Sequence, residues 1–125
     1  MADANAPLAA GRHATAISTG IYAIEILLKA KICRLLALAQ LPRIFGIHDL
    51  YGLATMAGLR QKLDDPVFKN TNVGQNWSRV LKYSQQLDEY RYKPDSRWSR
   101  QDAIDLLTSL QDQNKGVMPW IQKQT

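Results

Sequence analysis

The longest apolar-rich stretch of the chain, residues 19–41, places the strongest constraint on its fold. The stretch reads TGIYAIEILLKAKICRLLALAQL and contains no glycine or proline after Gly20. Apolar residues recur at helical spacings at Ile17, Ile21, Ile24, Leu28, Leu35 and Leu38, which is typical of one buried helix face. We therefore expect a helix over about residues 12–39, ended by Pro42, since proline disfavours the helical conformation of the preceding residue.

Other apolar side chains surround the same helix: Ile26, Leu27, Cys33 and Leu36. A helix that is apolar on most sides is normally covered on most sides. We expect this one to be central, and either neighbouring helices or a second copy of the chain would supply the cover.

The same stretch also carries the charged residues Glu25, Lys29, Lys31 and Arg34. Each costs about 2.5–3.5 kcal/mol at the centre of a bilayer, so we expect no membrane segment.

The N-terminal residues have no basic region ahead of an apolar run and do not resemble a signal peptide. A single cysteine, Cys33, excludes an intramolecular disulfide and is typical of the cytoplasm. With only two histidines, a zinc site is also excluded, and we expect no metal or cofactor.

The rest of the chain predicts further helices and no strands. We expect a short helix over residues 3–10, a helix that begins near Asp49 and is over by residue 64, and a helix over residues 76–87. Residues 64–75, DDPVFKNTNVGQ, are rich in turn-forming residues and predict a long, mobile loop.

The last helix is expected to begin after Ser99. Ser99 and Asp102 have the spacing of a capping box, and Gly116 and Pro119 are expected to kink or loosen the final turns. Its inward side chains should be Ala103, Leu107, Leu110, Val117 and Ile121. At 125 residues, the chain is expected to form a single domain over residues 1–125. The predicted fold is all-α, an up-and-down four-helix bundle with a short N-terminal helix.

Several short motifs follow one another along nearly the whole chain. They are Leu8, Gly11 and Arg12, Tyr22-Ala23-Ile24-Glu25, Leu28-Lys29-Ala30, His48-Asp49-Leu50 with Leu53, Trp77, Arg91-Tyr92 and Asp102-Ala103. Their order and spacing resemble the HEPN domain (higher eukaryotes and prokaryotes nucleotide-binding). The resemblance implies a four- or five-helix up-and-down bundle, frequently a homodimer, that associates with nucleotides or RNA. It also implies a nucleotidyltransferase partner, often in toxin–antitoxin or phage-defence systems.

Many HEPN proteins are metal-independent ribonucleases that use an arginine and a histidine separated by four to six residues. Arg43 and His48 have four residues between them. His48 would then act as a general acid or base, and Arg43 would stabilise charge on the phosphorane. However, Ile44 replaces the polar residue that follows the arginine in that branch, and the pair precedes a helix instead of lying on a later one. We therefore expect a non-catalytic module, in which His48 caps the next helix and Arg43 is a solvated charge. A metal-independent endoribonuclease is the alternative.

Glu25 and Lys29 lie four residues apart, the favourable order for a helical ion pair. With Tyr22 they are expected to form a structural polar network inside the bundle, because a buried ion pair needs further hydrogen bonds. The alternative is a polar cluster that contacts a nucleotide or organises a dimer.

The run from Trp77 to Arg100 interleaves five aromatic residues with six cations. Single-stranded nucleic acid binds such mixtures, since bases stack on aromatic rings and cations hold phosphates. The net charge of +5 is compatible with an anionic partner. The residues expected to contact a nucleotide or RNA are Arg91, Tyr92, Lys93 and Arg97. In the alternative interpretation, the aromatic residues of this run belong to the core.

Overall fold

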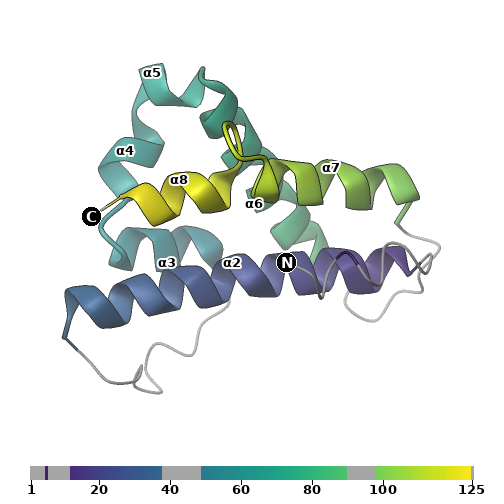
Figure 1. Ribbon diagram of the computed structural model, residues 1–125, viewed down its shortest axis with the longest axis horizontal. Helices are drawn as coiled ribbons and strands as arrows, with labels where there is room; N and C mark the ends of the chain where they lie inside the picture. The colour runs from purple at the N-terminus through teal and green to yellow at the C-terminus, as the bar shows by residue number, and fades with distance from the viewer. Residues whose placement is uncertain (1–4, 6–11, 38–48, 90–97, 125) are drawn as a thin grey trace.

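The computed structural model describes Asn5 and residues 12–37, 49–89 and 98–124 (Figure 1). These residues form seven helices and no strand: α2 (His13–Leu35), α3 (Leu50–Met56), α4 (Arg60–Asp64), α5 (Pro66–Lys69), α6 (Asn72–Glu89), α7 (Arg100–Gln111) and α8 (Val117–Lys123). The all-α prediction is therefore confirmed. The helix expected over residues 3–10 lies outside the described residues apart from Asn5. None of the helices in the described ranges is long and apolar enough to cross a membrane.

The long helix α2 forms the base of the fold and packs most extensively against α7. Figure 1 shows α2 running from right to left, with α7 and then α8 following the same direction above it. Gly20 lies where the two helices meet, and a Cβ atom added there would be 3.1 Å from Leu107 and 3.2 Å from Leu110. The missing side chain of Gly20 thus allows α7 to approach α2 closely.

The apolar spacing predicted the inner face of α2 correctly up to Leu28, but Leu35 is exposed and Leu38 lies outside the described residues. It buries Ile17, Ile21, Ile24 and Leu28, together with Ile32. The core continues into the other helices with Leu50, Leu53, Ala54, Ala57, Leu59, Leu63, Trp77, Val80, Tyr83, Trp98, Ala103, Leu106, Leu107, Leu110, Val117 and Ile121. Every helix except α5 contributes buried residues to this single cluster. The half-buried Phe68 of α5 packs against it.

The helix expected from Asp49 is present as α3, and the side chain of Asp49 accepts a hydrogen bond from Tyr51 N at 3.2 Å. Gly58 then adopts a positive φ of 80°, the left-handed conformation that ends helices and favours glycine. The chain restarts as α4 and reaches Asp64. The single helix expected between Asp49 and residue 64 is therefore two short helices, α3 and α4, joined by a turn.

The prediction of a long loop over residues 64–75 is wrong. Residues 66–69 form α5, and α6 begins at Asn72, four residues earlier than expected. Asp65 accepts a hydrogen bond from Val67 N at 3.0 Å, and the hydroxyl of Thr71 accepts one from Gly74 N at 3.1 Å. The same residue types that form turns also cap helices. Here Asp65 caps α5, and Thr71 caps the start of α6. Gly74 allows the corner, since a Cβ atom there would be 2.1 Å from the carbonyl oxygen of Phe68.

The prediction of one kinked C-terminal helix is also wrong, although all its predicted inward side chains are buried. The helix stops at Gln111, and α8 starts afresh after Gly116. The carboxylate of Asp112 accepts hydrogen bonds from Asn114 N at 2.9 Å and Lys115 N at 2.8 Å, which stabilises the turn. Pro119 lies in the first turn of α8, where no helical hydrogen bond is lost. Asp112 therefore determines the break.

The expectation that α2 is covered on most sides is not met within one chain. Tyr22, Ile26 and Leu36 are 59%, 49% and 51% exposed, and Leu35 is 53% exposed. The helix ends at Leu35 instead of near residue 39, and Ala37 follows with a positive φ of 54°. The four-helix up-and-down arrangement is not confirmed either, because short helices separate the longer ones.

We predict that Gly20→Leu lowers the free energy of unfolding by about 1–3 kcal/mol, because the added side chain would separate α2 from α7. Chemical denaturation followed by circular dichroism measures this change. Thr108→Leu is the matched control, since Thr108 is exposed on α7 and its replacement should change stability by no more than about 0.5 kcal/mol. Equal effects of the two substitutions would contradict the close approach at Gly20.

Candidate nucleic-acid interface

Six residues that the sequence analysis selected lie outside the described residues. They are Arg43, His48, Arg91, Tyr92, Lys93 and Arg97. Their roles in binding or catalysis therefore stay predictions. The expectation that His48 caps the next helix is wrong, because the N-cap of α3 is Asp49. The run from Trp77 to Arg100 is described on both sides of residues 90–97, at α6 and at the start of α7, so its flanks can be compared with the expectation.

The described aromatic residues of this run are core residues. Trp77, Tyr83 and Trp98 are only 4%, 9% and 7% exposed, and the rings of Tyr83 and Trp98 lie 6.1 Å apart. Aromatic rings that stack on bases must present an open face. These three aromatic residues therefore stabilise the fold and are not available for stacking on bases.

The cations of the same run have the opposite placement. Arg79, Lys82 and Arg100 are exposed. Arg79 and Lys82 lie three residues apart on α6, so they share one face of the helix. They line a pocket of about 360 Å³ with Ser78, Tyr83, Gln86 and Asp102, which we call the α6–α7 groove.

The position of Arg79 is fixed by neighbouring side chains. Its Nη1 atom donates to Asn76 Oδ1 and to Ser109 Oγ, both at 3.0 Å. The hydroxyl of Ser109 also donates to Asn76 Oδ1 at 3.2 Å. A guanidinium has five N–H donors, and this network uses one nitrogen only. The remaining donors of Arg79 can bind an anion without breaking the network.

The groove's one carboxylate, Asp102, belongs to a capping box, as predicted. Its Oδ2 atom accepts from Ser99 N at 2.9 Å, and Ser99 Oγ accepts from Asp102 N at 3.0 Å. The Tyr83 hydroxyl donates to Asp102 Oδ1 at 3.2 Å. The backbone hydrogen bond from Ser99, followed by the bonds from the hydroxyls of Ser99 and Tyr83, lowers the pKa of Asp102. Burial, and then the charge of Asp102, raises the pKa of Tyr83 to about 12.

At neutral pH the groove therefore contains two cations, one carboxylate that is already hydrogen-bonded, and a neutral phenol. The described lining of the groove carries a net charge of about +1, which favours an anion such as a phosphate. In the described part of the chain, no group of His, Cys, Asp and Glu side chains is placed to hold a metal ion. Sequence reasoning named Arg79 and Lys82 only as part of the basic run. The signal that selects them is their three-residue spacing on the polar face of α6.

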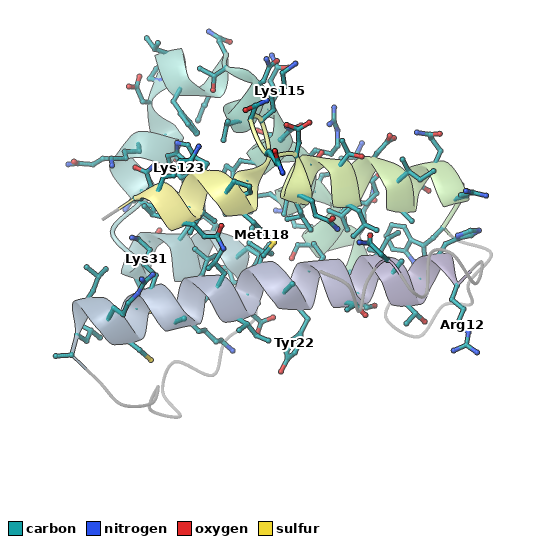
Figure 2. All side chains as sticks on the ribbon, in the orientation of Figure 1. Arg12, Tyr22, Lys31, Lys115, Met118 and Lys123 are labelled. Carbon is teal, nitrogen blue, oxygen red and sulfur yellow. The ribbon has the colours of Figure 1, made fainter. Side chains whose placement is uncertain are left out.

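On α2, Glu25 and Lys29 form an ion pair of 2.8 Å. Glu25 is 4% exposed, whereas Lys29 is half-buried. Tyr22 is 59% exposed, and Figure 2 shows its side chain pointing away from the helices above α2. Among the described residues, no hydrogen bond joins the Tyr22 hydroxyl to the pair. Glu25 is therefore buried, whereas its partner Lys29 and the tyrosine Tyr22 reach the outer surface of α2.

No protein-family model matches the sequence, and neither the curated proteins nor the solved structures provide a match. The HEPN resemblance therefore stays a prediction, and the function has to be argued from the chemistry of the described surface.

We predict that Asp102→Asn lowers the free energy of unfolding at pH 7 by about 1–2 kcal/mol, because it weakens the cap of α7. A carboxylate whose pKa is lowered by folding stabilises the protein above its unfolded pKa, and this contribution is lost as the pH falls through the folded pKa. The difference between wild type and variant should therefore shrink below about pH 4. Urea denaturation at several pH values measures it.

Asp105→Asn is the control, since Asp105 lies on the same helix and accepts a hydrogen bond from the exposed Gln101 at 2.7 Å. This variant should lose less than half as much stability at pH 7. A difference for Asp102→Asn that stays constant from pH 7 to pH 2 would contradict the role assigned to the carboxylate.

Proposed function

We propose that this protein is a HEPN-like, non-catalytic helical module that binds RNA or nucleotides through the α6–α7 groove and the adjoining residues Arg91, Tyr92, Lys93 and Arg97. The observation that carries the proposal is the placement of Arg79 and Lys82 as exposed cations on one face of α6. Helix α6 leads directly into residues 90–97, so the proposed surface is continuous in sequence. A nucleotidyltransferase partner, which the resemblance implies, belongs to the same proposal.

The burial of Trp77, Tyr83 and Trp98 determines what kind of binding is proposed. With these rings inside the core, the described lining of the α6–α7 groove offers charge and hydrogen bonds to phosphates but no open ring on which a base could stack. Binding through phosphates alone is insensitive to sequence and weakens steeply with salt. Any base stacking would have to come from Tyr90 or Tyr92, which lie outside the described residues.

We predict that Lys82→Gln weakens the binding of a fluorescein-labelled single-stranded RNA by about three- to ten-fold at low salt. It should also reduce the slope of log K against log salt by about 0.7, the value for one phosphate contact on a single strand. Fluorescence anisotropy at four salt concentrations measures both quantities. The RNA should carry a 5′ hydroxyl, so that backbone phosphates are the only ones present.

Lys69→Gln is the matched control, because Lys69 is also exposed but lies on α5. It changes the net charge equally and should leave the slope unchanged. If the wild type shows no binding at low salt, or if Lys69→Gln behaves like Lys82→Gln, the proposed groove is wrong. The same samples, incubated in chelator and compared with His48→Ala, test the ribonuclease alternative, since only an enzyme would shorten the RNA.

We further propose that two copies of the chain associate through the outer face of α2. This outer face carries residues at alternating spacings of four and three: Thr15, Thr19, Tyr22, Ile26, Lys29, Cys33 and Leu36. This spacing is that of a coiled-coil seam, and it lies on the side opposite the buried Ile17, Ile21, Ile24 and Leu28.

The charge of this outer face favours a second copy of the same chain. The one cation of the seam, Lys29, is already paired with Glu25 within its own helix. A two-fold interface brings the same surface of both copies together, so like charges would repel if they were unpaired. Here the exposed contacts would be made by Tyr22, Ile26 and Leu36, which are apolar or carry only a hydroxyl.

We predict that Ile26→Asp shifts the protein from dimer to monomer in sedimentation equilibrium, because it places a carboxylate on each side of the contact. The expected weakening is at least ten-fold, corresponding to about 1.4 kcal/mol or more. Val67→Asp is the control, since Val67 is 75% exposed on α5 and lies away from the seam. A wild-type protein that is monomeric at high micromolar concentration would refute this contact.

A further inference from the structure

A second group of cations meets at the far end of α2. Arg34 lies in its last turn, Lys31 lies one turn earlier, and Lys62 lies on α4. Lys31, Arg34 and Leu35 line a pocket of about 250 Å³ together with Gln122 and Gln124 at the end of α8. We call it the cationic pocket. It shares no residue with the α6–α7 groove.

Lys31 is buried to an unusual degree for a lysine, with only 4% of its surface exposed. Figure 2 shows its side chain rising from α2 toward the end of α8. Its ammonium group donates to the backbone oxygen of Gln124, and the ammonium of Lys62 donates to Gln124 Oε1 at 2.6 Å. The two lysines therefore converge on a single residue.

These cations have no anionic partner in the part of the chain that the structure describes. The ion pairs there join Lys29 to Glu25 and Arg60 to Asp64, and neither includes Lys31, Arg34 or Lys62. Burial lowers the pKa of Lys31, and the charges of Arg34 and Lys62 lower it further. A buried lysine surrounded by like charges is unfavourable unless something compensates it.

Helix ends supply only part of the compensation. The C-termini of α2 and α8 each carry a partial charge of about −0.5 at most. Among the described residues, three positive charges against a total of about −1 leave this end of α2 positive, by about +2. A divalent anion would balance this charge.

We propose that the cationic pocket binds the phosphate group of a small phosphomonoester. A phosphate dianion matches the remaining charge, and Arg34 offers the planar pair of donors that suits phosphate oxygens. The side-chain amides of Gln122 and Gln124 supply further polar groups at the rim. Leu35, which is 53% exposed, gives an apolar wall for the organic part of the ligand. This site is independent of the RNA-binding surface proposed above.

Isothermal titration calorimetry with inorganic phosphate and with adenosine monophosphate, at constant ionic strength, tests the proposal. We expect both ligands to bind the wild type. Equal affinities mean that the phosphate alone is recognised, and tighter binding of the nucleotide means that the apolar wall contributes, so both results support the pocket. Lys31→Met and Arg34→Gln should each weaken binding at least ten-fold, roughly the effect of losing one charge-assisted hydrogen bond.

Lys31→Met is expected to fold, since methionine fills a similar volume and removes a buried charge. Its melting temperature in chloride should equal or exceed that of the wild type. Because phosphate salts stabilise proteins in general, calorimetric binding and not the melting temperature decides the outcome. If the wild type gives no binding heat with phosphate up to about 10 mM, the proposal is wrong. It is also wrong if both variants bind phosphate as tightly as the wild type.

Two variants separate this site from the RNA surface. Lys82→Gln should keep the phosphate binding that Lys31→Met and Arg34→Gln lose, and Arg34→Gln should bind the 5′-hydroxyl RNA like the wild type. Loss of RNA binding in Arg34→Gln would overturn the independence of the pocket. If the wild type binds phosphate but not RNA, the pocket stands and the function proposed for the α6–α7 groove fails.

Discussion

The close contact between α2 and α7 at Gly20 is the constraint on which the rest of the structure depends. A long helix can bury its apolar face only if a neighbour approaches it, and Leu107 and Leu110 of α7 do so where α2 lacks a side chain. Once α7 is placed, its capping residue Asp102 comes within hydrogen-bond distance of Tyr83 on α6. The packing of two helices therefore also positions the wall of the groove.

In the run from Trp77 to Arg100, the described aromatic residues are buried in the core and the described cations are exposed on the surface. The rings of Trp77, Tyr83 and Trp98 bury large apolar areas, which stabilises the core. Arg79 and Lys82 remain outside, because a charged side chain loses more by desolvation than it gains by packing. The same segment of sequence thus supplies both the core and the surface on which the proposed RNA binding rests.

The two cationic regions differ in how their charge is balanced. In the α6–α7 groove, Asp102 offsets part of the charge of Arg79 and Lys82, and the groove is open to solvent. In the cationic pocket, Lys31 is buried near the charges of Arg34 and Lys62, and the oxygens that the two lysines contact among the described residues are those of Gln124. The burial of Lys31 strengthens its interaction with an anion, since electrostatic interactions strengthen as water is excluded.

Local chemistry in the sequence determined the long helices, the inner face of α2 from Ile17 to Leu28 and the capping box of Ser99, because period and capping depend on neighbouring residues only. Local reasoning failed at residues 64–75 and at the C-terminal helix. Asp65, Thr71 and Asp112 can end a helix or begin one, and the packing around them selects which. The sequence also identified the cationic run, and its alternative interpretation, in which the aromatic residues belong to the core, is confirmed for Trp77, Tyr83 and Trp98. Only the tertiary structure brought Lys31, Arg34 and Lys62 together, since Lys62 comes from a different helix and no local pattern encodes that contact.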